Sequence, residues 1–411
     1  MRFHPKRFVV GVAFSAGVFL LFFRSQSAWI AGDGYGQMEG GDPWQLFFAD
    51  SERSRNISKT STAAMTTIRL NIHAAAPTTF AITDDSIKEW LPDVNNTLPN
   101  YFTMRDNTAE DERRYRDGML VYVHLNKAAG STTKTCLSKV AHKRSVAGAV
   151  VVLHDMARLR VQSKLENRSK YNILMGGYAF GICDAARDEN CSYFTVLRDP
   201  YERLLSSFTY CRRAGMDQTC QGLSPWDVTL KEWAVHQGSY FFRQLLMKAW
   251  FCKPNPQYAK LGLIGIPHSQ KTTFLRSPCW FREKVILNRS LTPAQMDSLL
   301  AYCVEHLEEW FSVIGITDQY DLTLAMLEEV YQIPFQKTCT GSEINVSNYQ
   351  NLADNKEVNR TETVLDWKRE LQEDPKVYEA LRGDIVIYEK AKEIFERQKV
   401  AFLARKQQRV P

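Results

Sequence analysis

The stretch MLVYVHLNKAAGSTTK, residues 119–134, indicates the fold class most clearly. Its first half is a short apolar run of the kind that forms a buried strand. Its second half is a Gly/Ser/Thr loop that runs into a helical pattern ending at about Ala141. The strand pattern recurs in GAVVVLH (148–154), YNILMGG (171–177), SYFTVL (192–197) and FSVIGIT (311–317).

Helical patterns separate or follow these strands. They cover residues 201–213, 292–309, 318–331 and about 384–398. Strands that alternate with helices indicate an α/β domain with a central parallel sheet that is covered on both faces.

The composition is that of an ordinary globular protein, because 44% of the 411 residues are hydrophobic and 24% are charged. This excludes a chain that is disordered throughout, a collagen-like fibre and a multi-span membrane protein. The net charge of +6 is small for this length, so we expect no nucleic acid as a partner.

The N-terminus contains an uncharged apolar run, FVVGVAFSAGVFLLFF, at residues 8–23. As a helix it would span about 24 Å, slightly less than the ~27–30 Å of a bilayer core. The basic residues before it favour a cytosolic tail (1–7), a signal anchor (8–24) and a luminal remainder. The small residues Ser25, Ser27 and Ala28 leave a cleaved signal peptide as the alternative, and both interpretations place the bulk of the chain in the secretory lumen.

Glycosylation and cysteine patterns agree with that placement. Asn-x-Ser/Thr sites occur at Asn56, Asn95, Asn167, Asn190, Asn288, Asn345 and Asn359. None of the nine cysteines forms a Cys-x-x-Cys pair, so we expect no zinc site. We expect no other metal either, because a lysine and backbone amides can supply the positive field at the candidate sites described below. In an oxidising compartment we expect local bridges such as Cys183–Cys191 and Cys211–Cys220, with Cys136 as the unpaired thiol.

Residues 25–115 lack sustained periodicity and are rich first in Gly, then in Thr, Ser and Ala, and finally in charge. This composition is typical of a stem, here luminal, that holds the folded domain (116–411) away from the membrane.

The first candidate site is HLNKAAGSTTK, residues 124–134, between a strand and a helix. Gly130 allows a ligand to approach the backbone closely, and free amides at the start of the helix can bind an anion beside the Lys127 ammonium. The segment is not a GxxxxGK[ST] loop, because its lysine precedes its glycine. By itself such a segment can also be an ordinary turn.

The second candidate site is LRDPYERLLSSF, residues 197–208. Asp199 as N-cap, Pro200 at the first helical position and Glu202 in a capping-box position have a purely structural explanation. Arg198 lies at the carboxyl end of a strand, where α/β sheets bind ligands, and Ser206 is expected to face inward two turns later. An arginine and a hydroxyl placed there can grip a phosphate, whereas a simple salt bridge is the alternative role for Arg198.

Together the two segments resemble the Golgi carbohydrate sulfotransferases, particularly the heparan sulfate 2-O-, 6-O- and uronyl 2-O-sulfotransferase branch. The first is similar to their PKxxGT/S loop for the 5′-phosphosulfate of the donor, 3′-phosphoadenosine 5′-phosphosulfate (PAPS). The second is similar to their RDPxxRxxS segment for the donor's 3′-phosphate. Looser similarity covers about 119–400 and implies a P-loop-kinase-like sulfotransferase fold.

The resemblance assigns roles to individual residues. Lys127 would contact the bridging oxygen of the donor and stabilise the leaving phosphate. The 5′-phosphate would be held by Ala128, Gly130, Ser131, Thr132 and Thr133, and the 3′-phosphate by Arg198 and Ser206.

The chain departs from the family pattern at two places. Asn126 replaces the usual proline before the lysine. The family's catalytic histidine is also missing, because Gly177 or Cys183 stands where it is expected. Asp184 and His154 are the candidates for the base that takes the proton of the acceptor hydroxyl.

The resemblance implies a single-pass type II protein of the Golgi membrane that transfers a sulfuryl group from PAPS to a glycan hydroxyl. The acceptor would be a glycosaminoglycan or a glycoprotein glycan. Two alternatives remain: a luminal pseudoenzyme that binds donor or glycan without chemistry, and a sulfotransferase acting on protein tyrosines. A homo-oligomer is left open.

Overall fold

The computed structural model describes residues 85–92, 94–105, 108–143, 150–152, 173–185, 190–212, 218–220, 223–248, 279–339 and 360–409. All of them belong to one compact unit. The expected tail and anchor (1–24), most of the expected stem, His154 and Cys252 lie outside the described residues. No helix of the described part is long and apolar enough to span a membrane.

The core is a parallel sheet of five strands in the order β2-β3-β1-β4-β5, which confirms the predicted α/β architecture. The strands are β1 (Met119–Val123), β2 (Val150–Val152), β3 (Ile173–Gly176), β4 (Cys191–Leu197) and β5 (Phe311–Ile316). Every residue of β1, β3, β4 and β5 is buried, as expected for a sheet covered on both faces.

Strand register brings the candidate sites to one edge of the sheet. Val123, the last residue of β1, pairs with Gly176 of β3 and with Thr195 of β4. His124, Gly177 and Arg198 therefore leave the carboxyl ends of three adjacent parallel strands, which is where ligands bind in such sheets.

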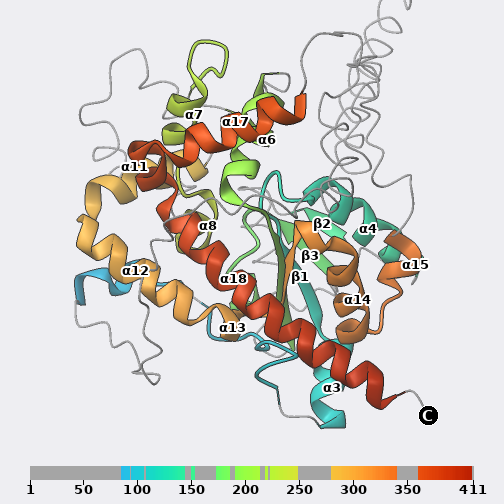
Figure 1. Cartoon of the computed structure of the whole chain (residues 1–411). Coiled ribbons are helices and arrows are strands. Elements are labelled where there is room, and N and C mark those ends of the chain that lie inside the picture. Colours follow the sequence, from blue (N-terminus) through green and yellow to red (C-terminus); the bar gives the residue numbers. More distant parts are fainter. Residues whose placement is uncertain are drawn as a thin grey trace, which may run out of the picture. The chain divides into compact units, whose positions relative to one another are not determined.

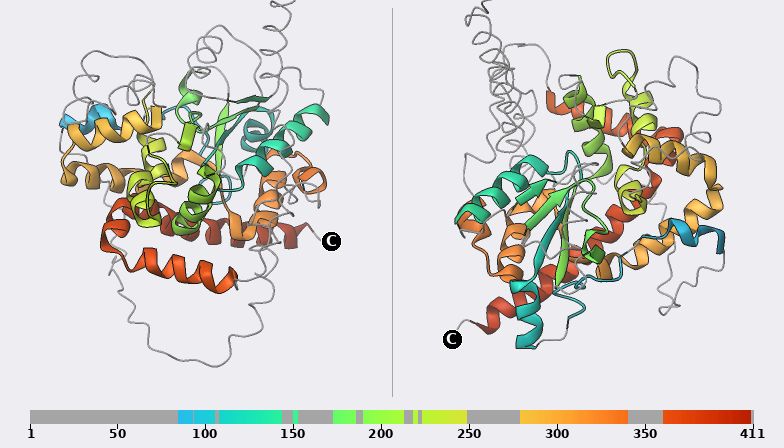
Figure 2. Two further views of the ribbon diagram at one scale, coloured as in Figure 1. Left: turned by 90° about the horizontal axis from the view of Figure 1, so that it is seen from above. Right: turned by 180° about the vertical axis from the view of Figure 1, so that it is seen from behind.

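Helices cover both faces of this sheet (Figures 1 and 2). On one side lie α4 (Gly130–Lys143), α14 (Tyr320–Tyr331) and α15 (Phe335–Cys339). On the other side lie α18 (Pro375–Gln408) and α8 (Tyr240–Leu246), and α7 (Leu230–Gln237) packs on α18 beyond the sheet. The remaining helices are α3 (Ala109–Asp117), α6 (Pro200–Cys211), α11 (Cys279–Ser290), α12 (Pro293–Glu305), α13 (Leu307–Trp310) and α17 (Arg360–Gln372).

Helix boundaries follow capping chemistry. The helix expected over 292–309 starts with Thr292 and Gln295 in a capping box, and ends at His306, where the short α13 begins. The final helix is longer than predicted: it has 34 residues and starts at Pro375, where the Asp374 carboxylate accepts hydrogen bonds from two backbone amides.

A segment assigned to the stem from its composition is part of the folded domain. Residues 94–102 run across the amino ends of β4 and β5, where the Leu98 amide bonds the Cys191 carbonyl (2.8 Å) and the Tyr101 amide bonds the Ser312 carbonyl (3.0 Å). The side chains of Ile87, Trp90, Leu98 and Tyr101 are buried in the core. The folded domain thus begins at or before Asp85 rather than at 116, because apolar residues spaced without periodicity still contribute to the core.

One buried amide joins this segment to the sheet and to α18. Gln398 of α18 accepts from Asn100 Nδ2 (2.8 Å) and from the Ile314 amide (3.0 Å), and it donates to the Ile314 carbonyl (2.7 Å). Its side chain is fully buried and makes three hydrogen bonds, which favours a single arrangement of the three elements.

The disulfides agree with the sequence in two cases and correct it in a third. Cys183–Cys191 and Cys211–Cys220 are both present, as expected. Cys136 is not the unpaired thiol: it bridges to Cys339, 203 residues away, and joins α4 to α15. Among the described cysteines the free thiol is the buried Cys303.

Candidate functional site

The loop between β1 and α4 has an uncommon backbone. Lys127 (φ 67°) and Ala129 (φ 56°) both adopt the left-handed conformation, which disfavours residues other than glycine by roughly 1–2 kcal/mol each. Left-handed residues alternating with right-handed ones turn successive amides toward a common concavity that binds anions. Ala129 precedes α4 and has no side-chain oxygen, so it cannot cap the first amides of the helix in the way that Asp199 caps α6.

The three hydroxyls of this loop differ in their availability. Ser131 is exposed and Thr132 is half-buried, so both can reach a bound anion. Thr133 is buried, and its hydroxyl bonds the Ala129 carbonyl (3.0 Å) and the Tyr320 hydroxyl (2.9 Å). Ala128 is also fully buried. The side chains of Thr133 and Ala128 therefore pack within the protein and support the loop.

The side chain of Lys127 packs on the aromatic ring of Tyr210. Lys127 Nζ lies 3.9 Å from the centroid of the Tyr210 ring, on the last turn of α6. Such a cation–π contact contributes ~0.5–2 kcal/mol. Tyr210 could not be identified from the amino-acid sequence, because nothing in the sequence shows that α6 folds back over the loop.

The second candidate site lies beside the first. Arg198 Nη1 is 3.5 Å from the Lys127 carbonyl oxygen, so the ends of β1 and β4 converge on one place. Asp199 caps α6 by accepting from the amides of Tyr201 and Glu202 (3.0 Å each), as predicted. Glu202 does not complete a capping box in this structure; its carboxylate lies 3.6 Å from Arg198 Nε. Ser206 is half-buried on α6.

A lysine from a helix distant in sequence pairs with the two carboxylates of this second candidate site. Lys368 of α17 lies 3.2 Å from the Asp199 carboxylate and 3.0 Å from that of Glu202. Burial alone would lower the pKa of Lys368, but these two carboxylates raise it above its ordinary value. The Glu202 carboxylate is thus shared between Lys368 and Arg198.

A third carboxyl group follows β5 at the same edge of the sheet. Burial, together with the charge of Glu202, raises the pKa of Asp318. This edge of the sheet thus combines three positively charged side chains with three carboxyl groups. The positively charged residues are Lys127, Arg198 and Lys368, and the carboxyl groups belong to Asp199, Glu202 and Asp318.

Arg203, which the motif includes, has a structural role here. It is almost fully buried and lies 3.8 Å from the Asp384 carboxylate of α18. Asp384 also accepts hydrogen bonds from the amides of Tyr240 and Phe242 (2.9 Å each), at the start of α8. The pair fixes α6, α8 and α18 to one another behind the site.

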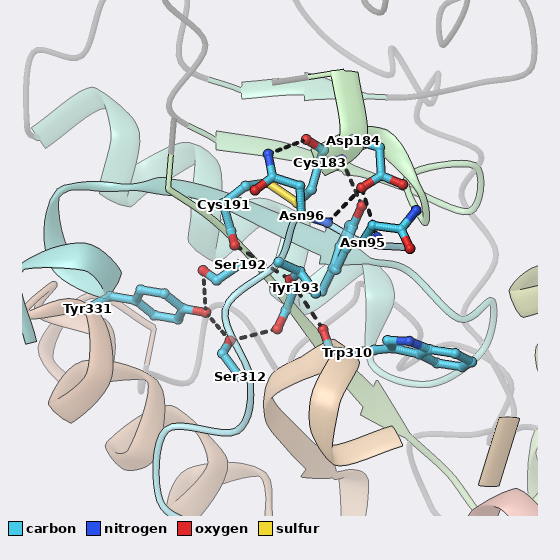
Figure 3. The surroundings of a disulfide bond; sticks show 11 residues. Asn95, Asn96, Cys183, Asp184, Cys191, Ser192, Tyr193, Trp310, Ser312 and Tyr331 are labelled. Atoms are coloured by element: carbon cyan, nitrogen blue, oxygen red, sulfur yellow. Dashed lines mark hydrogen bonds between the residues drawn. A yellow bond between two sulfur atoms is a disulfide. The ribbon is translucent and has the colours of Figure 1, made fainter. Parts of the chain in front are cut away.

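The structure places Asp184 at the wrong end of the sheet for a base. Its Oδ1 accepts hydrogen bonds from the amides of Asn95 (2.9 Å) and Asn96 (2.8 Å), beside the Cys183–Cys191 bridge (Figure 3). Cys191 starts β4, whereas Arg198 follows its last residue, so about 20 Å of strand separates the two ends. Asp184 anchors the segment that crosses the sheet and does not reach the site. His154 lies outside the described residues.

No group of three or more His, Cys, Asp or Glu side chains that could hold a metal ion occurs in the described part of the chain. The positively charged side chains of this edge, together with nearby backbone N–H groups, suit a ligand with more than one phosphate.

Comparison with known proteins agrees with this geometry. Residues 114–266 match a family model described as the sulfotransferase family. The match includes both candidate sites and supports a sulfotransferase, an enzyme that transfers a sulfuryl group. A search of curated proteins gives no match.

Proposed function

We propose that the protein transfers a sulfuryl group from PAPS to a hydroxyl group of a glycan in the Golgi lumen. The observation that carries the proposal is the convergence of two anion-binding devices. One is the left-handed loop that presents Lys127 and the first amides of α4; the other is Arg198 at the end of the adjacent strand β4.

The site suits a donor with two separated phosphate groups. The amides at the start of α4, with Ser131 and Thr132, would hold the 5′-phosphosulfate. Arg198 and Ser206 would hold the 3′-phosphate. The Lys127 ammonium would neutralise the charge that develops on the leaving phosphate, which is the main task in an in-line transfer of this kind.

Three features support a luminal location. The apolar run at 8–23 follows basic residues. The described part contains three disulfides, which persist in oxidising compartments. The glycosylation sites Asn95, Asn190 and Asn288 are all exposed.

The test is transfer of labelled sulfate from PAPS by the full chain, purified in mild detergent, to a panel of desulfated glycosaminoglycans, glycoprotein glycans and tyrosine peptides. We expect label in one glycan. Lys127→Ala should reduce kcat by at least about 10²–10³-fold, because the leaving phosphate loses its counter-charge. Arg198→Ala should mainly weaken donor binding.

The matched control is Lys390→Ala, because Lys390 pairs with Glu393 on the exposed side of α18 and lies outside the site. It should retain wild-type activity. A Lys127→Ala variant with near-normal activity would contradict the proposal, and label in the peptides alone would identify a protein-tyrosine sulfotransferase.

A second candidate is a donor-binding pseudoenzyme. It is favoured by the lack of a side chain at Gly177 and by the remote position of Asp184. Tight binding of 3′-phosphoadenosine 5′-phosphate without transfer to any acceptor would support this alternative.

A further inference from the structure

We propose that His124 is the general base of the sulfuryl transfer. This inference rests on the function proposed above and supplies the group that the reaction otherwise lacks. Three observations carry it: the fixed position of His124, the contact of its imidazole with the anion-binding loop, and the location of the other candidates.

The backbone of His124 is held on both sides. Its amide donates to the Gly176 carbonyl (3.0 Å), and its carbonyl accepts from Gln244 Nε2 (3.2 Å). Gln244 Nε2 also donates to the Gly177 carbonyl (3.0 Å), so one α8 side chain ties together the residues that follow β1 and β3. A fixed backbone of this kind limits the positions that the imidazole can take.

The imidazole lies directly on the first residue of α4. A Cβ atom at Gly130 would be 1.6 Å from His124 Nε2 and 2.2 Å from Cδ2, which only glycine avoids. Nε2 is therefore at the anion-binding loop itself, beside the amides that would hold the phosphosulfate. Among the described titratable groups, the Tyr122 ring lies beside it, with its centroid 5.7 Å from that of His124. Lys127 follows three residues later in the same loop, and Arg198 Nη1 lies 3.5 Å from the Lys127 carbonyl oxygen.

The other histidines whose side chains the structure describes lie away from the anion-binding loop. His306 packs on Tyr302 (4.0 Å between centroids) just before β5, at the amino end of the sheet. His236 lies on α7 against Trp233. Of these three, His124 alone follows the carboxyl end of a strand.

In the proposed step the acceptor hydroxyl is the nucleophile and the 5′-phosphate is the leaving group. The acceptor hydroxyl gives its proton to His124 Nε2 while its oxygen bonds to the sulfur. The bond from sulfur to the bridging oxygen breaks, and its electron pair stays on the 5′-phosphate, beside Lys127. The products are the sulfate ester and 3′-phosphoadenosine 5′-phosphate, and the imidazolium then releases its proton to solvent.

The test compares His124→Asn with wild type in two measurements on the full chain. Loss of a base should reduce kcat about 10²–10⁴-fold. Binding of 3′-phosphoadenosine 5′-phosphate, measured by calorimetry, should stay within about threefold, and this binding also reports that the variant is folded. His124→Gln serves as the second variant, and His306→Asn as the histidine control with wild-type activity.

The pH profile separates a base from a residue that only supports the loop. In wild type the rate should fall on the acidic side as the imidazole becomes protonated, and the residual rate of His124→Asn should lack this limb. A parallel loss of nucleotide affinity and activity, or an unchanged rate, would overturn the assignment of His124 alone. A wild-type chain that transfers no sulfate would overturn the proposed function as well.

Discussion

At the scale of single residues, Lys127 combines a strained backbone with a side chain held on an aromatic ring. The left-handed conformation aims its neighbouring amides at the anion site, while Tyr210 limits the positions of its ammonium group. Both features place positive charge before the donor arrives, and preorganised charge of this kind is what lowers the barrier of a transfer reaction.

Removing the Tyr210 ring should therefore slow the reaction without unfolding the protein. We expect Tyr210→Leu to reduce kcat about 2–30-fold, which corresponds to the ~0.5–2 kcal/mol of a cation–π contact. Tyr210→Phe keeps the ring and should stay close to wild type in initial-rate assays. Equal losses in both variants would show that the hydroxyl, not the ring, matters.

At the scale of elements, the Cys136–Cys339 bridge joins α4, which starts with the anion-binding loop, to α15 on the same face of the sheet. The bridge closes a loop of 203 residues, whereas Cys211–Cys220 closes one of nine. A longer loop has more conformational entropy in the unfolded chain, so the long bridge should stabilise the fold more.

The comparison can be made with paired alanine variants. The Cys136→Ala/Cys339→Ala variant should lose about 2–3 kcal/mol more unfolding free energy than Cys211→Ala/Cys220→Ala, from the difference in loop entropy. Guanidinium denaturation followed by tryptophan fluorescence measures both. A larger loss for the short bridge would contradict the entropic explanation.

At the scale of the whole molecule, the folded domain extends into sequence that composition assigns to a stem. Burial of a large apolar side chain contributes roughly 1.5–3 kcal/mol, so Ile87, Trp90, Leu98 and Tyr101 together approach the ~5–15 kcal/mol stability of a typical domain. A fragment of residues 110–411 should therefore fail to fold, whereas 84–411 should be soluble and show a cooperative thermal transition. Equal melting temperatures for the two fragments would place the boundary near 116 after all.

Much of this architecture could be predicted from sequence, because strand runs and the Asp199–Pro200 cap are local signals. The loop and Arg198 were identified for the same reason: each adjoins a strand end. Asp184 was misplaced because its position depends on how the chain returns from β3 to β4. Tyr210 and Lys368 were not identified, because their roles come from contacts between elements that are far apart in sequence. His124 lies in the first candidate segment, but the role proposed for it depends on its close packing on Gly130, which the sequence does not show.

The long bridge also has a consequence for biosynthesis. Cys339 is made 203 residues after its partner, which takes about 10–40 s at ~5–20 residues per second. In the secretory lumen proposed above, Cys136 would be an unpaired thiol during this interval, while Cys183, Cys191, Cys211 and Cys220 emerge one after another. Correct pairing then requires that the two short bridges close early among themselves, or that a disulfide isomerase corrects the errors. Yield of this protein in cells should accordingly depend on isomerase supply more than the yield of a chain with only the two local bridges.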